Sequence, residues 1–593
     1  MRELEYPFDN FFIIRNRKKI KSKLLEQLNK KDIIKKNIAI LGGSTTTYIK
    51  EILELFLLDN NIVPTFYESD YAQYWNDVMF DNNKLIEFKP DVIFVHTTSR
   101  NIKLFPTVRN SSKSIETMLL EEFSHFEVMW EKISKVYKCP IIQNNFEQPF
   151  FRLLGNRDVW DIHGKTNFIT QLNQRFYEYA QLNENFYIND INYISSCYGI
   201  QKWSEPLHWY AYKYALCIEA IPEFAYNLSN IIKSIYGKNK KAIVCDLDNT
   251  LWGGNIGDDG IENIEIGKET TYGQLYTEFQ SYLKAHKDLG ILLAVNSKNE
   301  EKNALKGLMH PNSILKPNDF ITIKSNWNSK DKNIVDIASE LNIGTDTIVF
   351  IDDNPAEREI VNKSVGEIVT PKMSDAEQYI NILDRSGFFE TTQFSMEDLN
   401  RNEVYKSNIK RLKYKNSFVD YNEYLVSLKM RAEIKPFTKI YTNRIAQLIN
   451  KSNQFNLTSL KCTQSDIENF IGNEKYITLY GKLEDKFGDN GIVSVTFGHI
   501  DNSFFHIDLL LMSCRVLNRC MEKAMMDSLI DECKKRKISK VYGYYYKTEK
   551  NDMVKNFYAD NGFIKNSEDN GNTVWELEIK KYKKQNHIIG VNL

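Results

Sequence analysis

The sequence DLDNTLWGG, residues 246–254, decides the fold of the middle of the chain. It follows a short apolar run, residues 242–245, whose length is typical of a buried parallel strand. In open α/β sheets, ligands bind at the carboxyl ends of the strands, and this strand ends in Asp246 and Asp248. Two acids at this spacing can divide the catalytic work. We therefore predict that Asp246 is a nucleophile and metal ligand, and that Asp248 is a general acid/base.

Three later segments supply the other groups that phosphoryl transfer needs. A second apolar run ends in Ser297, whose hydroxyl suits a phosphate oxygen. Lys330 begins a helical segment, and its ammonium group can neutralise phosphate charge. A third apolar run precedes Asp352 and Asp353, and Mg²⁺ prefers carboxylate oxygens. The order of these groups predicts a magnesium-dependent phosphoryl-transfer site.

This ordered set resembles the haloacid dehalogenase (HAD) superfamily of aspartate-nucleophile phosphotransferases. The tryptophan and glycines of residues 246–254 resemble its FkbH-like branch. The resemblance implies that Asp246, Asp248, Ser297 and Lys330 are catalytic. It also implies a Mg²⁺ site of Asp246, Asp248, Asp352 and Asp353, and a substrate site of Thr250, Asn296, Gly253 and Gly254.

The gaps between these motifs bear on the substrate and on the lysine. The segments between Asp246, Ser297 and Lys330 are too short to hold a large cap domain. Because caps shape pockets for small substrates, an uncapped site suits a large substrate carried on a protein, or a lid supplied by a flanking domain. We favour a macromolecular partner. Lys324 is an alternative for the lysine role, since spacing alone does not separate it from Lys330. We favour Lys330 because it begins the helix that leads into the last strand.

Length and composition restrict the class of protein. The chain has 593 residues and a mass of 69.5 kDa, enough for about three domains. A net charge of −1 does not favour a nucleic-acid partner. No apolar run approaches about 18 residues, so we expect a soluble, cytoplasmic protein with no membrane partner. Eight cysteines without a CxxC pair argue against a disulfide framework.

The pattern of strands and helices predicts an α/β protein of three domains. Alternating strands and helices predict two open α/β domains. By resemblance, the first is SGNH- or flavodoxin-like and the second is a HAD-like Rossmann-type core without a large cap. A run of strands around a long helix predicts an α+β domain, which resembles the GNAT fold. The predicted bounds are 1–35 for an N-terminal helical arm, 36–237 for the SGNH-like domain, 238–385 for the HAD-like domain, 386–430 for a helical linker, 431–582 for the GNAT-like domain and 583–593 for a tail.

The first domain contains a candidate catalytic triad. Its predicted strands are residues 37–41, 62–67, 91–96 and 140–145. Ser44 follows the first of them, and Glu205 and His208 lie near the end of the domain. These residues resemble the outer blocks of SGNH hydrolases, which implies a Ser–His–Glu triad. However, the first block is Gly-Gly-Ser rather than Gly-Asp-Ser, and such a serine is commonly a helix cap. A docking role for the domain is therefore the favoured alternative.

The last domain resembles GNAT acyltransferases in its order of strand, basic turn, long helix and strand. That fold binds the phosphates of CoA, or of a carrier's phosphopantetheine, at the helix N-terminus. Arg515 and Arg519 of the turn are the implied phosphate contacts. Family members have glycines where this chain has Asn518 and Cys520, and glycine allows the backbone to approach a phosphate closely. We therefore favour a carrier-docking domain over an active acetyltransferase.

The FkbH resemblance also implies a reaction. The best-understood members transfer a glyceryl group from a phosphorylated glycerate donor to the thiol of an acyl carrier protein, in polyketide, secondary-metabolite or surface-glycan biosynthesis. Those members have a cysteine before the motif-two serine, whereas this chain has Asn296, which cannot form a thioester. Cys245 is no substitute, because alternate side chains of a strand face opposite ways. Two hypotheses follow: direct attack by the carrier's thiol, or a stand-alone phosphatase acting on a phosphorylated sugar or acyl intermediate. A scaffold with little turnover is disfavoured by the intact set of acids, serine and lysine.

Overall fold

The computed structural model describes residues 1–28, 33–392, 394, 396–548 and 550–592. The chain forms two compact units, Met1–Tyr236 with Thr463–Asp466, and Gly237–Cys462 with Ile467–Leu593. Within the described ranges, no helix combines the length and the apolar character needed to cross a membrane.

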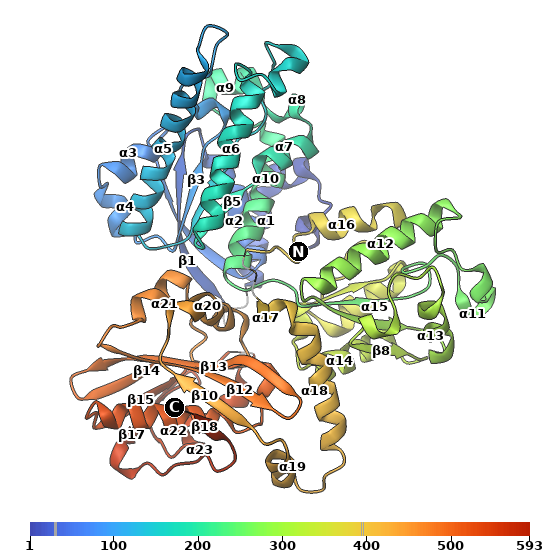
Figure 1. Ribbon diagram of the computed structural model, residues 1–593, viewed down its shortest axis with the longest axis vertical. Coiled ribbons are helices and arrows are strands. Elements are labelled where there is room, and N and C mark those ends of the chain that lie inside the picture. Colours follow the sequence, from blue (N-terminus) through green and yellow to red (C-terminus); the bar gives the residue numbers. More distant parts are fainter. Residues whose placement is uncertain (29–32, 393, 395, 549, 593) are drawn as a thin grey trace. The chain divides into compact units, whose positions relative to one another are not determined.

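The first unit is built on a parallel sheet of five strands in the order β2-β1-β3-β4-β5 (Figure 1). The strands are β1 (Ile34–Gly42), β2 (Ile62–Glu68), β3 (Val92–His96), β4 (Ile141–Asn144) and β5 (Phe186–Asn189). The four strands predicted from sequence are confirmed. β5 was not predicted, because its four residues, FYIN, are flanked by polar residues and give no periodic signal.

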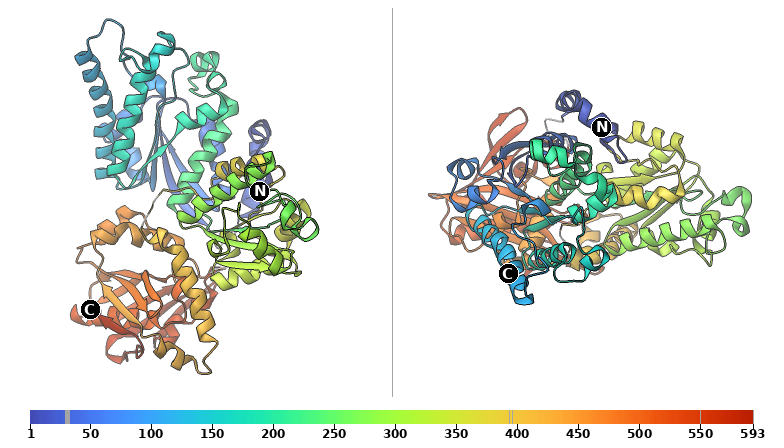
Figure 2. Two further views of the ribbon diagram at one scale, coloured as in Figure 1. Left: turned by 45° about the vertical axis from the view of Figure 1, so that its right-hand side comes forward. Right: turned by 90° about the horizontal axis from the view of Figure 1, so that it is seen from above.

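Helices cover both faces of this sheet (Figures 1 and 2). Alternate residues of β1 face opposite cores: Ile38 and Ile40 pack with one helical layer, and Ala39 and Leu41 with the other. The first layer contains α1 (Asn10–Gln27), α2 (Thr47–Asp59), α7 (Ile191–Tyr198) and α10 (Ile221–Ile235), and the second α3 (Tyr74–Met79), α4 (Asn83–Phe88), α5 (Ser112–Val136) and α6 (Lys165–Leu182). Because α1 contributes buried Ile13 to the core, the predicted N-terminal arm is an integral part of this unit.

The second unit begins with the HAD-like core, a parallel sheet in the order β8-β7-β6-β9. Its strands are β6 (Ala242–Cys245), β7 (Leu292–Ser297), β8 (Thr322–Ser325) and β9 (Ile348–Ile351). The helices around them are α12 (Thr271–Asp288), α13 (Glu301–Met309), α14 (Lys330–Leu341), α15 (Pro355–Val365) and α16 (Tyr379–Arg385). Cys245 is fully buried in the apolar packing, and burial raises the pKa of its thiol. The prediction that it faces away from the site is confirmed.

The segment between β6 and α12 is a short flap rather than a cap domain. It contains α11 (Ile256–Asp259), and Gly253 pairs with Glu265 in an antiparallel bridge. All of its residues are described, and none of them builds a further domain. This agrees with the uncapped site that the motif spacing predicts.

The remainder of the second unit is a helical segment followed by an α+β domain. The helices are α17 (Met396–Leu399), α18 (Arg401–Lys415) and α19 (Tyr421–Ser427). The sheet has the order β16-β17-β15-β14-β13-β12-β10-β18, with β11 (Phe455–Asn456) paired to β14. Its strands are β10 (Arg431–Lys435), β12 (Tyr476–Asp485), β13 (Gly488–Asp501), β14 (Phe504–Met512), β15 (Lys540–Tyr545), β16 (Ile564–Asp569), β17 (Asn572–Glu578) and β18 (Gly590–Asn592).

The predicted order of strand, turn, long helix and strand is present in this domain. β14 leads through the turn into α22 (Met521–Lys535), and β15 returns parallel to β14 within an otherwise mainly antiparallel sheet. α20 (Thr442–Lys451), α21 (Gln464–Phe470) and α23 (Phe557–Asp560) are further helices of this part of the chain. The predicted tail is not a free extension, because β18 pairs with β10 and forms the end of the sheet.

Candidate active site

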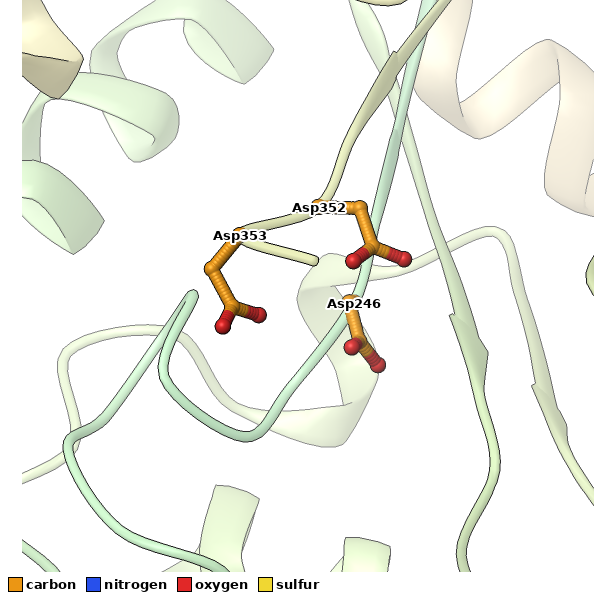
Figure 3. Close-up of side chains that lie close together, drawn as sticks. All are labelled: Asp246, Asp352 and Asp353. Atoms are coloured by element: carbon orange, nitrogen blue, oxygen red, sulfur yellow. The ribbon is translucent and has the colours of Figure 1, made fainter. Parts of the chain in front are cut away.

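Three carboxylates meet at the carboxyl edge of the HAD-like sheet. Asp246 follows β6, and Asp352 and Asp353 follow the neighbouring strand β9. Each offers an oxygen within 4.8 Å of the others, and Figure 3 shows the three side chains gathered at the strand ends. Asp246 and Asp352 are buried, while Asp353 is half-buried. Such an oxygen-rich group suits a hard divalent cation.

The crowding of these acids is visible in their pKa values. Burial and the negative charge of Asp246 raise the pKa of Asp352 to about 6. The same two causes raise the pKa of Asp353. Carboxylates this close repel one another unless positive charge lies among them, so the site requires a cation to hold all three acids ionised.

Lys330 supplies part of that positive charge. It is the first residue of α14, and its Nζ lies 2.7 Å from Asp246 Oδ2 and 2.6 Å from Asp352 Oδ2. Burial lowers the pKa of Lys330, but the two aspartates outweigh burial and raise the pKa above its usual value. Lys324 instead pairs with Glu340. The geometry therefore favours Lys330 over Lys324.

The two oxygens of Asp246 have different surroundings. Oδ2 contacts Lys330, whereas Oδ1 is buried and has no hydrogen-bond partner within the described part of the chain. An unpaired buried carboxylate oxygen is costly. Oδ1 is therefore the atom left for a bound cation or for attack on phosphorus.

The side chain of Asp248 does not join this carboxylate group, and its predicted place among the metal ligands stays a prediction. Its Oδ1 accepts hydrogen bonds from Trp252 Nε1 (2.9 Å) and from the backbone N–H of Ile256 (3.2 Å). Its Oδ2 accepts one from Asn299 Nδ2 (2.7 Å). Among the described residues, the candidate metal group contains only Asp246, Asp352 and Asp353. The flap thus holds the Asp248 carboxylate in one orientation, as a general acid/base requires.

Asn299 was missed by the sequence analysis. It is buried, and its Nδ2 also lies 3.3 Å from Oγ of Ser297, so it links Asp248 to the end of β7. Ser297 is 2% exposed and ends its strand at the same edge as Asp246. The only signal in the sequence was a second polar residue two positions after the serine.

Asn296 is not placed to bind a substrate, which corrects that prediction. It is fully buried, its Nδ2 donates to the backbone oxygen of Lys330 (2.9 Å), and its Oδ1 accepts from Asn333 (3.0 Å). Both ends of the amide hold the start of α14, so this side chain positions Lys330. The pleat of β7 turns it away from Ser297.

The other three predicted substrate contacts also have internal roles. Thr250 is fully buried, and its hydroxyl accepts from the backbone N–H of Asp353 (3.2 Å). Both backbone groups of Gly253 are used in the flap bridge. The N–H of Gly254 donates to Asn249 Oδ1 (2.9 Å), and its φ of 88° favours glycine. These residues build the loop around the acids rather than a substrate pocket.

Arg358 is a further residue that sequence reasoning missed. Its Nη1 donates to the backbone oxygens of Asp352 (2.5 Å), Asp353 (2.7 Å) and Met373 (3.0 Å). One guanidinium group therefore fixes the loop that carries two of the three acids. Any residue type supplies a backbone oxygen, so the spacing of sequence motifs gave no indication of these contacts of Arg358.

Comparison with known proteins shows what the chain resembles. Residues 37–233 match the family model of the FkbH N-terminal domain. A crystal structure of the N-terminal part of the protein BF1531 from Bacteroides fragilis, containing a phosphatase domain complexed with Mg, is 29% identical with a TM-score of 0.58. That match covers 63% of this chain and 99% of the other. The N-terminal part of the chain thus resembles the FkbH N-terminal domain, and the chain resembles the BF1531 fragment that contains a phosphatase domain.

Matches to the last domain are weaker. A GNAT-family acetyltransferase from Staphylococcus aureus is 17% identical, with a TM-score of 0.20, and covers 25% of this chain and 99% of its own. The PaiA N-acetyltransferase from Thermoplasma acidophilum, in complex with coenzyme A, is 16% identical with a TM-score of 0.20. That match covers 25% of this chain and 98% of the other. The fold of this domain is therefore defined by its own strand order and not by these matches. No curated protein matches the chain.

In the first unit, two of the three triad candidates lie together. His208 Nδ1 lies 3.0 Å from Glu205 Oε2 on α9 (Pro206–Tyr212) and its N-cap. Ser44 is 2% exposed, and its Oγ has no hydrogen-bond partner among the described residues. Its neighbour Thr45 donates to the backbone oxygen of Tyr212 (2.7 Å). The loop after β1 thus lies against α9, while the complete triad stays a prediction.

In the last domain, Arg519 is not available to a phosphate, which corrects that prediction. It is 8% exposed and lies 3.2 Å from Asp485, a fully buried acid that also pairs with Arg411 at 2.7 Å. Arg515 is half-buried, and its Nε donates to Ser513. Asn518 and Cys520 have φ angles of 60° and 65°. The turn keeps the left-handed conformation that glycine would adopt most easily.

Proposed function

We propose that the FkbH-like chain is a Mg²⁺-dependent phosphotransferase in which Asp246 accepts the phosphoryl group. The observation that carries this proposal is the contact of one buried lysine with two aspartates beside a third. Asp246, Asp352 and Asp353 would hold Mg²⁺, which neutralises the phosphate oxygens when bound. The Mg bound by the similar BF1531 phosphatase domain supports the choice of metal.

Each residue of the site has its own role in the proposed reaction. Lys330 holds Oδ2 of Asp246, so that Oδ1 faces the phosphorus. The new bond between Oδ1 and phosphorus forms as the bond to the leaving oxygen breaks. Asp248 gives a proton to that oxygen when it needs one, and afterwards takes a proton from the acceptor. Ser297 donates to a phosphate oxygen. The donor would be a phosphorylated glycerate or a related small molecule.

The acceptor is the second part of the proposal. Neither Asn296 nor Cys245 presents a thiol to the site, because one is bound to the start of α14 and the other lies in the apolar core. A glyceryl or other acyl group would therefore pass directly to a thiol brought by a partner, and an acyl carrier protein with its phosphopantetheine arm is the proposed one. The thiol would attack the acyl carbon of an acyl phosphate, so that the thioester bond forms as the bond from that carbon to the phosphate oxygen breaks and phosphate leaves. Asp246 would act on the other phosphate of the donor, the phosphate ester, and pass it to water. The uncapped site leaves room for such an arm.

The same observation supports a second candidate. Without a thiol of its own, the site could pass the phosphoryl group from Asp246 to water. The chain would then be a stand-alone phosphatase acting on a phosphorylated sugar or acyl intermediate.

One experiment tests both parts. The chain is incubated with Mg²⁺, 1,3-bisphosphoglycerate and a phosphopantetheinylated carrier protein, while phosphate release and the intact mass of the carrier are followed. A glyceryl-sized mass gain supports loading, and phosphate release without it supports the phosphatase. Asp246→Asn should reduce phosphate release by at least ~1,000-fold. Unchanged turnover in that variant would refute the mechanism common to both candidates.

A further inference from the structure

The carboxyl edge of the first unit's sheet forms a surface outside the phosphoryl-transfer site. Residues 97–113, 145–166 and 199–213 build it, and they follow β3, β4 and α7. We call it the carboxyl-edge surface. In open parallel sheets this edge is where ligands bind, near the point where the strand order reverses. In this sheet the order reverses between β1 and β3.

Side-chain contacts join the three segments into one surface. The Cζ atom of Arg100 lies 4.6 Å from the ring centre of Trp209 and 5.4 Å from that of Phe150. The Nζ atom of Lys165 lies 4.9 Å from the ring centre of Phe105. Each of these contacts crosses from one segment to another and places a cation over an aromatic face. The segments therefore hold one another in place.

The surface is strongly basic although the whole chain has a net charge of only −1. Residues 97–113 contain four basic residues and no acidic one. The acids of residues 145–166 add little negative charge to the surface, because Glu147 and Asp158 are buried and Asp161 is paired with Arg157. Among the described residues of the three segments, Glu205 is the exposed acid. The exposed basic side chains are Lys103, Arg109, Lys113, Arg152, Arg157 and Lys202.

Large apolar side chains stand among these charges. Leu153 is 80% exposed, Leu207 75%, Tyr210 72% and Leu104 66%. Exposed apolar groups gathered in one region commonly mark interaction sites. Tyrosine, tryptophan and arginine are the residues that contribute most to protein–protein binding. A nucleic acid would use the charges and the rings but would leave the exposed leucines in water, so the combination favours a protein.

We propose that the carboxyl-edge surface docks an acidic protein, and that this protein is the carrier that brings the acceptor thiol. The identity of the partner rests on the proposed function. Complementary charge would speed the encounter and make it sensitive to salt, while the apolar side chains would supply contact area. The first unit would then recruit the partner, and the central domain would perform the chemistry.

The test compares two triple variants of the full chain that change the net charge equally. One is Arg109→Glu/Arg152→Glu/Lys202→Glu on the carboxyl-edge surface. The control is Arg15→Glu/Lys18→Glu/Lys19→Glu on α1, and all six side chains are exposed. Binding to a panel of phosphopantetheinylated acyl carrier proteins is measured by isothermal titration calorimetry at low and at physiological salt. We expect the first variant to raise Kd at least tenfold and the control to change it less than twofold.

A second variant keeps the charge and removes apolar contact. Leu153→Gln/Leu207→Gln should also weaken binding severalfold, with Leu182→Gln, 83% exposed on α6, as its control. Melting temperatures identify any variant that fails to fold. Equal Kd values for the surface variants and their controls would overturn the proposal, as would binding of single-stranded RNA in place of every carrier. Asp246→Asn should bind the carrier normally, and the surface variants should release phosphate normally, so failure of docking is distinguishable from failure of the phosphotransferase.

Discussion

The carboxyl edges of the two parallel sheets use charge in opposite ways. At the edge of the HAD-like sheet, Asp246 and Asp352 are buried and joined by Lys330. At the edge of the first unit's sheet, the basic side chains stand exposed on loops and helices. Buried charges at short distance interact strongly because little water screens them, whereas exposed charges act weakly and over a longer range. We therefore propose that one edge performs the chemistry and that the other recruits a partner.

Among tests of this comparison, the largest effect is expected from the substitution that removes the buried cation, the ammonium group of Lys330. Lys330→Met keeps the length of the side chain but leaves Asp246 and Asp352 without their shared partner. We expect phosphate release to fall by at least ~100-fold. The metal-free variant should also melt at a lower temperature, because a buried pair that loses one partner is strongly destabilising.

The matched control for this variant is Lys324→Met. Lys324 begins no helix at the site and pairs with Glu340 outside the carboxylate group. Its loss should change phosphate release less than about threefold, since partly exposed ion pairs contribute little. Equal effects of the two substitutions would show that Lys330 has no special role.

A second prediction concerns pH and metal. The pKa of Asp352 is raised from 3.8 to about 6 by burial and by Asp246. A carboxyl whose pKa is raised in the folded state favours folding fully below its unfolded pKa, and that contribution is lost as pH rises through the folded pKa. Metal-free protein should therefore lose stability between about pH 4 and pH 6.

Mg²⁺ should reverse that loss, because it binds the ionised carboxylates. The increase in melting temperature on adding Mg²⁺ should be larger at pH 7.5 than at pH 5, where protons compete with the metal. Scanning calorimetry with EDTA or with MgCl₂ measures both quantities. In Asp352→Asn, the increase in melting temperature caused by Mg²⁺ should depend less on pH. If that pH dependence is unchanged, it comes from groups other than Asp352.

The sequence was sufficient to predict those site residues whose positions follow from the end of a strand or the start of a helix. Asp246 and Asp352 were predicted because an apolar run fixes where a strand ends and where its acid lies. Lys330 was preferred over Lys324 because it begins a helix, and the contacts of its Nζ agree. In these cases local pattern and tertiary position coincide.

Side-chain direction separates the residues that were misplaced. For Asn296, the alternation of strand residues that placed Cys245 correctly also argues against a position beside Ser297. Asn296 and Ser297 are neighbours on β7, yet the first holds α14 and the second faces the edge. Asn299 and Arg358 were missed because their partners come from other loops or are backbone oxygens. Short elements such as β18 were missed because three residues carry no periodicity.

A third prediction tests the orientation of the general acid/base. Asn299 donates one of the hydrogen bonds that hold Asp248, so Asn299→Ala should lower the rate of phosphate release about tenfold. Mg²⁺ affinity should stay within about twofold, since Asn299 lies outside the carboxylate group. Steady-state kinetics should show the loss in kcat. Asn312→Ala, at an exposed position of the same domain, should leave kcat unchanged.

The smallest effect is expected at the edge of the first unit's sheet. Ser44 Oγ is buried without a partner in the described part of the chain, so its removal in Ser44→Ala takes away a desolvated group and no hydrogen bond. The melting temperature should stay equal or rise slightly, and phosphate release should not change. A fluorophosphonate probe should leave wild-type Ser44 unlabelled, because a recruiting edge needs no nucleophile. Labelling that disappears in Ser44→Ala would instead complete the triad with His208 and Glu205 and make both edges catalytic.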